Sequence, residues 1–204
     1  TISPAAGTVN ADSFDNTVIS GHTALAAEPA DTDEFLVSDA GTIKRIDYSL
    51  IKSKGKILQV VGATITSNQS GSTSSETMIS NYVAQITPSS TSSKIWVMFS
   101  GTAQVEDSNS AGYNCAFKLR INTGSAASTS SSDYQQVRFG AYDYNSAGGT
   151  VEEHGVLVFN YLHSPSTTSA VHVGISVANY DGAPNYRLGI ADYKSHFILM
   201  EVEG

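Results

Sequence analysis

The feature that most constrains this chain is a series of eight short runs rich in apolar and β-branched residues, each bounded by turn-forming residues. Such runs predict β-strands, and no convincing helix lies between them. Eight strands without a helix predict an all-β sandwich of two sheets, for which the jelly roll is the commonest arrangement. The predicted strands are Lys56–Thr66, Met78–Thr87, Lys94–Glu106, Tyr113–Ile121, Tyr134–Asp143, Val151–His163, Ala170–Asn179 and Tyr186–Glu203. In the last run, Gly189 or Asp192 is expected to mark a bulge.

Composition agrees with strands joined by polar turns, because only 15% of the residues are charged and 40% are hydrophobic. The 11 Lys and Arg residues against 19 Asp and Glu residues give a net charge of −8. A nucleic-acid partner is not expected, since phosphate contacts require a basic surface. Membrane insertion is not expected either, since no apolar run approaches the roughly 20 residues that a spanning helix needs.

The chain divides by pattern into residues 1–54 and residues 55–204. The first segment has no periodic stretch long enough to bury a core of its own. Its strand candidates, Glu34–Val37 and Thr42–Ile46, flank Asp39-Ala40-Gly41, which predicts a hairpin. We therefore expect an extended β-rich stalk or docking segment that is ordered by packing on something else, neighbouring copies first of all. Residues 55–204 are predicted to form the head domain.

Four of the head's predicted strands have one apolar side and one polar side. In Tyr113–Ile121, for example, Phe117 and Leu119 alternate with Lys118 and Arg120. The second, fifth and seventh strands alternate in the same way. These four strands are predicted to form a sheet with one face in the core and one in water.

The first, third, sixth and eighth strands are apolar on both sides and must be covered on both faces. One sandwich covers only one face, so self-association is the economical explanation. The residues predicted to lie in this interface are Leu58, Val60, Trp96, Met98, Leu157, Phe159, Tyr161, Phe197 and Leu199.

This division of strands resembles the trimeric jelly roll of the tumour-necrosis-factor and complement type. Residues 24–51 (ALAAEPADTDEFLVSDAGTIKRIDYSLI) resemble a segment common in structural proteins of marine bacteriophages, just before a terminal head domain. The phrases GKILQVV (55–61), ITPSSTSSKI (86–95), YLHSPSTTSA (161–170) and ILMEVE (198–203) resemble landmarks of a phage tail-fibre C-terminal domain. The resemblance covers residues 24–203 in patches, and it implies a trimeric virion fibre with this domain near its distal end.

No catalytic motif is present, so we expect no enzyme, no catalytic residue and no cofactor. Glu152-Glu153-His154 superficially resembles a site, but neighbouring residues of a strand point to opposite faces. The five His residues lack metal-ligand spacing, and no metal site is predicted. Asp31, Asp33 and Glu34 could hold a cation, but turn amides are their expected partners.

Successive loops of a sandwich alternate between its two ends. The loops after the first, third, fifth and seventh strands are therefore predicted to share the end distal to residues 53–55. They are Ser67–Thr77, Asp107–Gly112, Tyr144–Thr150 and Tyr180–Asn185. Tyrosines among small polar residues make adaptable binding surfaces. The receptor-binding candidates are Tyr113, Asp143, Tyr144, Asn145, Tyr180, Asp181, Asn185 and Tyr186.

The sequence thus favours a homotrimeric virion fibre protein that binds a host surface polysaccharide or outer-membrane protein through its distal loops. Its N-terminal segment would attach to other virion proteins, and the mature protein would reside in the virion. One alternative is a structural virion protein without receptor binding, such as a head fibre, decoration or tail-assembly protein. A less favoured one is an enzymatic tailspike with a site between subunits.

Overall fold

The computed structural model describes residues 20–52, 55–72, 74–107, 113–141, 151–181, 185–190 and 193–204. The chain divides into two compact units, Thr1–Ser53 and Lys54–Gly204. Among the described residues, no helix is long and apolar enough to cross a membrane.

The described part of the first unit is built around the predicted hairpin, β1 (Glu34–Asp39) and β2 (Thr42–Asp47). Ala40 (φ 48°) and Gly41 (φ 84°) form its two-residue turn, and positive φ at both positions matches the twist of a hairpin. One helical turn, α2 (Tyr48–Ile51), follows. Asp33 accepts a hydrogen bond from the Ala30 N–H at 2.9 Å, the turn role predicted for an aspartate here.

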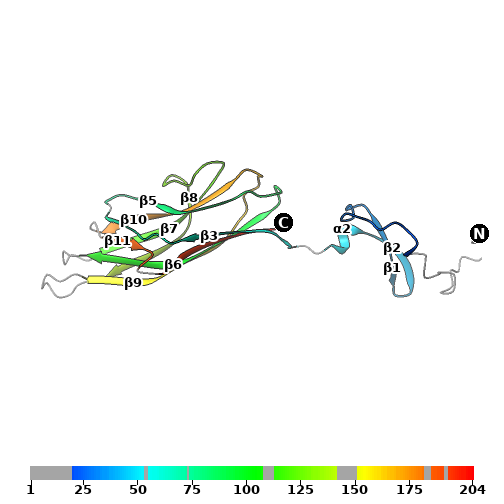
Figure 1. Cartoon of the computed structure of the whole chain (residues 1–204), viewed down its shortest axis with the longest axis horizontal. Helices are drawn as coiled ribbons and strands as arrows, with labels where there is room; N and C mark the ends of the chain where they lie inside the picture. Colours follow the sequence, from blue (N-terminus) through cyan, green and yellow to red (C-terminus); the bar gives the residue numbers. More distant parts are fainter. Residues whose placement is uncertain are drawn as a thin grey trace, which may run out of the picture. The chain divides into compact units, whose positions relative to one another are not determined.

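Within the described residues, the second unit contains two antiparallel sheets that face each other as a sandwich (Figure 1). Their strands are β3 (Ile57–Ile65), β4 (Gln69–Ser72), β5 (Thr77–Ile86), β6 (Lys94–Asp107), β7 (Tyr113–Thr123), β8 (Ser132–Ala141), β9 (Val151–His163), β10 (Val171–Asp181), β11 (Asn185–Leu188) and β12 (Ser195–Val202). The four-stranded sheet has the order β5-β10-β7-β8, and the six-stranded sheet has the order β3-β12-β6-β11-β4 with β9 on the other side of β6.

The strand order confirms the predicted jelly roll and the predicted membership of both sheets. Two short strands differ from the prediction: β4 lies within the predicted loop Ser67–Thr77, and β11 falls at the start of the last predicted strand. β4 continues the line of β3, and β11 continues the line of β12 along the same side of β6. The last predicted strand is therefore interrupted between Leu188 and Ser195, and Gly189 (φ 73°) begins the interruption. The six strands therefore form four rows across the sheet: β3 with β4, β12 with β11, β6, and β9.

The core lies between the two sheets and is filled by alternate side chains from both. Phe99 of β6 is at its centre, with ring centroids 4.8 Å from Phe197 of β12 and 6.1 Å from Phe159 of β9. Tyr82, from the four-stranded sheet, meets the same ring edge-on at 6.1 Å. Aromatic rings in these arrangements add packing energy to the area that they bury.

The two ends of the sandwich differ in what leaves them. At one end Asp107 pairs with Val151, and Asn185 pairs with both Glu106 and Ser72. The connections after β4, β6, β8 and β10 all leave from this end, which we call the loop end. The C-terminus lies at the opposite, base end (Figure 1).

The predicted interface is wrong for five residues of β9 and β12. Leu157, Phe159, Phe197 and Leu199 are at most 1% exposed and belong to the core. Tyr161 is half-buried and packs on Tyr134, with ring centroids 4.8 Å apart. Paired residues of neighbouring strands point to the same face, and Phe159 and Phe197 both pair with the inward Phe99. The predicted Leu58, Val60, Trp96 and Met98 do lie on the outward face.

Candidate functional site

The outward face of the six-stranded sheet carries an apolar surface across all of its long strands. Val60, Met200, Trp96 and Leu162 form one continuous row, because each is the register partner of the next. Val60 is 59% exposed, and Leu162 is 50% exposed. We call the part of this face near the base end the apolar half; its members are Leu58, Val60, Trp96, Met98, Val156, Val158, Leu162, Ile198 and Met200.

The apolar half contains both a large aromatic side chain and a hollow. Trp96 donates its indole N–H to the Asn160 side chain, so its polar group is satisfied within the chain. Next to it is a shallow hollow of about 270 Å³. Met98, Val158 and Ile198 line that hollow together with Phe99, Ser100, Phe159, Asn160 and His196. An apolar surface with relief of this kind can interlock with a second apolar surface.

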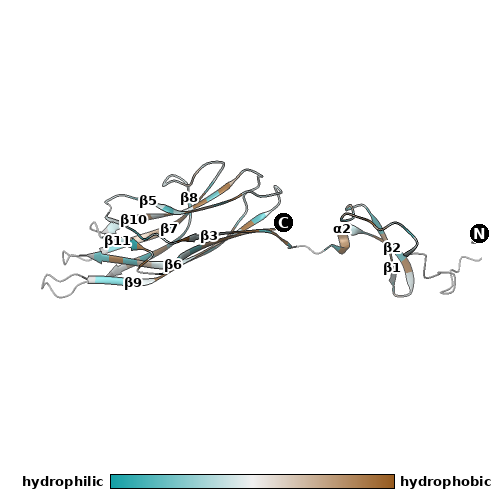
Figure 2. Cartoon of the chain, in the orientation of Figure 1, coloured by the Kyte–Doolittle hydropathy of each residue, from teal (hydrophilic) through white to brown (hydrophobic). Residues whose placement is uncertain are grey.

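The same face becomes polar toward the loop end. We call this part the polar half; its members are Ser70, Ser72, Gln104, Glu106, Glu152, His154, Asn185 and Arg187. Figure 2 shows that β9 is hydrophilic at its start. His154 and Glu152 lie on one side of β9 and form a 2.9 Å pair, whereas Glu153 points the other way and accepts from the Gly140 N–H.

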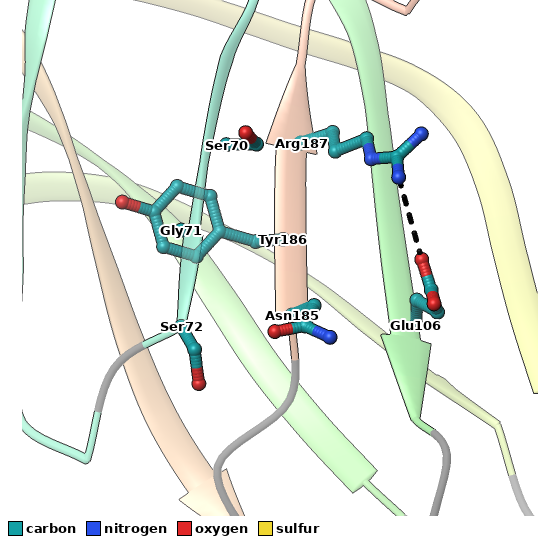
Figure 3. Close-up of a pocket in the computed structure, with 7 residues that line it drawn as sticks. All are labelled: Ser70, Gly71, Ser72, Glu106, Asn185, Tyr186 and Arg187. Atoms are coloured by element: carbon teal, nitrogen blue, oxygen red, sulfur yellow. Dashed lines mark ion pairs between the residues drawn. The ribbon is translucent and has the colours of Figure 1, made fainter.

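A second hollow, of about 260 Å³, lies within the polar half (Figure 3). Arg187 and Asn185 of β11 face it, flanked by Ser70 and Ser72 of β4 and by Glu106 of β6. The Arg187 guanidinium lies 3.8 Å from the Glu106 carboxylate, and its side chain is 55% exposed. The hollow is therefore lined by hydrogen-bond donors and acceptors, among them one cationic and one anionic side chain.

The outward face of the four-stranded sheet has a different character. Glu76, from the segment before β5, lies over the sheet and accepts hydrogen bonds from Arg120 (2.9 Å), Lys118 (3.0 Å) and Ser176 (2.7 Å). Burial tends to raise the pKa of Glu76, but these hydrogen bonds outweigh it and hold the pKa below its ordinary value. This face is covered and neutralised by the chain itself.

The predicted receptor-binding residues are found in several places. Asp143, Tyr144 and Asn145 lie outside the described residues. Tyr113 and Asp181 lie at loop-end strand termini, Tyr113 opening β7 and Asp181 closing β10. The other candidates are Tyr180, Asn185 and Tyr186.

Those three residues do not form one surface. Tyr180 is 43% exposed on the four-stranded sheet, where its ring lies 4.1 Å from the Arg138 guanidinium. Asn185 is exposed in the polar half of the other sheet. Tyr186 is only 9% exposed and packs edge-on against Phe117, so its prediction as a receptor contact is wrong. It alternates with Asn185 and Arg187, and a residue between two outward neighbours points inward.

Sequence reasoning missed several exposed members of both halves. Val156, Val158 and Ile198 are not in the predicted interface, because a strand that is apolar on both sides does not show which side faces outward. Arg187 could have been found, since it alternates with the apolar Tyr186 and Leu188. Ser70 could not, because β4 contains no apolar residue that would mark it as a strand. Among the described residues, no group of His, Cys, Asp and Glu could hold a metal ion.

Comparison with known proteins gives only distant similarities. No protein-family model matches the chain, and no curated protein matches it. The chain is similar to structures of infectious bursal disease virus: the Gx strain at 11% identity and a TM-score of 0.29, the Gt strain at 10% and 0.30, and the VP2 subviral particle at 9% and 0.28.

These matches cover 80%, 80% and 84% of this chain but only 42%, 41% and 46% of the viral chains. The chain thus spans less than half the length of the structures that it matches. TM-scores of this size do not identify a common fold, so the jelly-roll assignment rests on the strand order.

Proposed function

We propose that the protein is a virion fibre component that assembles as a homotrimer and binds a structure on the host-cell surface with the loop end of its head. The observation that carries this proposal is the apolar half of the six-stranded sheet. Leu58, Val60, Val156, Val158 and Leu162 are 38–68% exposed on one continuous face. Large contiguous apolar surfaces on soluble domains mark interaction sites.

Further copies of the same chain are the occupant that best explains this surface. The hairpin of the first unit also exposes large apolar side chains, with Leu36 77% exposed and Ile43 70% exposed. An isolated two-stranded hairpin is marginally stable at best. Two separate units of one chain thus need a cover at the same time, and association of identical chains supplies both covers. The number three comes from the resemblance within residues 24–203.

The receptor-binding part of the proposal is supported by the topology. Connections that join rigid strands at one end of a sandwich are well placed for binding, because the scaffold fixes where each loop begins and ends. Several equal loop ends in one trimer, and several fibres on one virion, would multiply weak single contacts. Residues 1–54 are proposed to attach to other virion proteins.

Sedimentation velocity on the full chain tests the assembly. We expect one species with the mass of three chains across the micromolar range. A folded monomer at those concentrations would contradict the proposal, because the apolar half would then be stable in water.

Adsorption of fluorescently labelled protein to a panel of marine bacterial isolates tests the receptor function. We expect adsorption to some isolates, and we expect Tyr144→Ala to abolish it while the trimer persists. Tyr193→Ala is the matched control, because Tyr193 is 70% exposed but lies between β11 and β12, away from the loop end. A trimer that adsorbs to no isolate but binds other virion proteins would instead be a structural virion component.

A further inference from the structure

We propose that the polar hollow at the loop end is a binding site for one neutral sugar ring with neighbouring hydroxyl groups. The inference rests on the proposed function for the source of the sugar, a host surface glycan, but its chemistry can be tested separately. It starts from the division of one sheet face into two halves of opposite character.

The first step is that the polar half stays open when the apolar half is covered. Arg187 is 55% exposed, and the Glu152–His154 pair is 44% and 51% exposed. Burying these charges against another copy would cost desolvation energy that only closely matched partners could offset. Association of copies is therefore expected to stop where the face becomes polar. The hollow lies beyond that point, at the loop end of the sheet, where Asn185 pairs with Ser72 and Glu106.

The second step is the geometry of the lining. Tyr186 and Leu188 point into the core, so Asn185 and Arg187 point outward from β11. Asn185 pairs with Ser72 on one side and with Glu106 on the other, and Arg187 pairs with Ser70. Register partners share a face, so all five side chains surround the same hollow (Figure 3).

The third step is the chemistry of the ligand. A sugar hydroxyl both accepts and donates a hydrogen bond. One hydroxyl can therefore accept from the Arg187 guanidinium and its neighbour can donate to the Glu106 carboxylate. The pair is 3.8 Å apart, beyond hydrogen-bond distance, so the two groups can turn to such a ligand without breaking a short bond. Ser70, Ser72 and Asn185 add groups of both kinds.

The fourth step is the exclusion of other ligands. A carboxylate on the sugar would be attracted by Arg187, but it would be repelled by Glu106, 3.8 Å from that guanidinium, and by a chain of net charge −8. An apolar ligand would find little exposed ring, because Tyr186 is among the residues that line the hollow but is only 9% exposed. The volume of about 260 Å³ is smaller than that of typical drug-sized sites, roughly 300–1,000 Å³, and suits a single ring.

Saturation-transfer difference NMR on the full chain tests the site, with the methyl glycosides of glucose, galactose, mannose and glucuronic acid as probes. We expect signals from at least one neutral glycoside and a weaker signal from the glucuronide. Arg187→Gln and Glu106→Gln should each weaken binding of that glycoside at least about tenfold, the usual effect of losing a charged hydrogen-bond partner. Thermal unfolding of each variant confirms that the fold is kept.

Two matched controls remove the same groups elsewhere. Glu152→Gln changes the carboxylate directly opposite Glu106 in the register, outside the hollow. Arg45→Gln changes an exposed arginine of the hairpin that also pairs with a glutamate. Both controls should bind the glycoside like the parent chain.

Three results would overturn the site: no signal from any probe, unchanged binding in both hollow variants, or tighter binding of the glucuronide. Cell adsorption keeps this inference separate from the proposed function. A chain that binds no sugar but adsorbs to cells overturns only the inference. A chain that binds the glycoside through Arg187 and Glu106 but adsorbs to no cell supports the site and contradicts the receptor function.

Discussion

The outward faces of the two sheets differ in how far the chain itself covers them. On the four-stranded sheet, Arg120 is only 6% exposed and Ser176 is fully buried, because Glu76 folds over both and bonds to them. On the six-stranded sheet, no described segment of the head covers Val60 or Val158, which are 59% and 52% exposed. The chain thus covers the polar groups of one outward face, whereas apolar side chains of the other face stay exposed.

This difference shows how one sandwich can separate water-facing and partner-facing surfaces. A polar face can be completed locally, since a single carboxylate satisfies several donors. An apolar face of four strands requires a surface of similar size, which a short loop cannot supply. The chain covers its first surface with the segment that carries Glu76, and we propose that other copies cover the second surface.

The difference between the two outward faces is tested most directly by placing the same charge on each of them. Val158→Lys puts an ammonium group in the apolar half, where burial of an unpaired charge costs on the order of several kcal/mol per copy. We expect association to weaken at least about a hundredfold. Sedimentation velocity should show monomers at concentrations where the parent chain is proposed to form trimers.

Val83→Lys is the matched control on the four-stranded sheet, since Val83 is also 52% exposed. It should leave the trimer intact. Equal effects of the two substitutions would mean that the two faces do not differ in role.

The second prediction removes Glu76, the residue that covers the outward face of the four-stranded sheet. Glu76→Ala leaves the nearly buried Arg120 with only the more distant Asp133 carboxylate, 3.9 Å away, and such a loss should reduce the free energy of unfolding by about 3 kcal/mol. Chemical denaturation measures this change. Glu152→Ala removes a carboxylate from an exposed pair and should cost less than about 1 kcal/mol. A small effect of Glu76→Ala would show that the ion pairs do not hold this face together.

The membership of each sheet could be predicted from the sequence, because strands with one apolar side and strands with two differ in alternation. The inward side of the second kind could not. In β9, Val156 and Val158 are as apolar as Leu157 and Phe159. The alternation therefore does not show which of the two sets points into the core. Only the pairing of Phe159 with Phe99 decides which set is buried.

The candidate site was even less accessible from sequence. The loop end could be located, because it follows from the order of strands. The hollow could not, since it depends on pairing of β4, with its serines, to β11. The burial of Glu201 within an apolar strand was equally hidden, because its partners Gln59 and Ser89 are remote in the sequence.

The third prediction concerns pH. Glu201 is fully buried near the base end and accepts hydrogen bonds from the backbone N–H and hydroxyl of Ser89. Burial raises its pKa, but these hydrogen bonds outweigh burial and lower the pKa from 4.5 to about 2. A carboxyl whose pKa is lower in the folded state stabilises the fold above its unfolded pKa. That stabilisation should be lost as the pH falls from 4.5 to about 2.

Glu201→Gln tests this origin of acid sensitivity. It should cost about 2 kcal/mol at neutral pH, because a neutral amide replaces a charged acceptor of several bonds. It should also flatten the dependence of the unfolding free energy on pH below 4.5, the pKa of a free glutamate. The pKa of Glu76 is lowered as well, so the Glu76→Ala variant should keep the share due to Glu201. An unchanged pH profile in Glu201→Gln would contradict the assignment.

The smallest expected effect comes from the outward face of the four-stranded sheet, and it tests whether an exposed contact there contributes to stability or assembly. Arg138 lies over the Tyr180 ring at 4.1 Å, and the Tyr180 hydroxyl donates to Gln136. Arg138→Gln should cost only about 0.5 kcal/mol, because an exposed cation–π contact is weak. The trimer should persist, since the four-stranded sheet is complete without a partner. If Arg138→Gln instead dissociated the trimer, the four-stranded sheet would also contact other copies. The proposal that only the six-stranded sheet faces other copies would then be wrong.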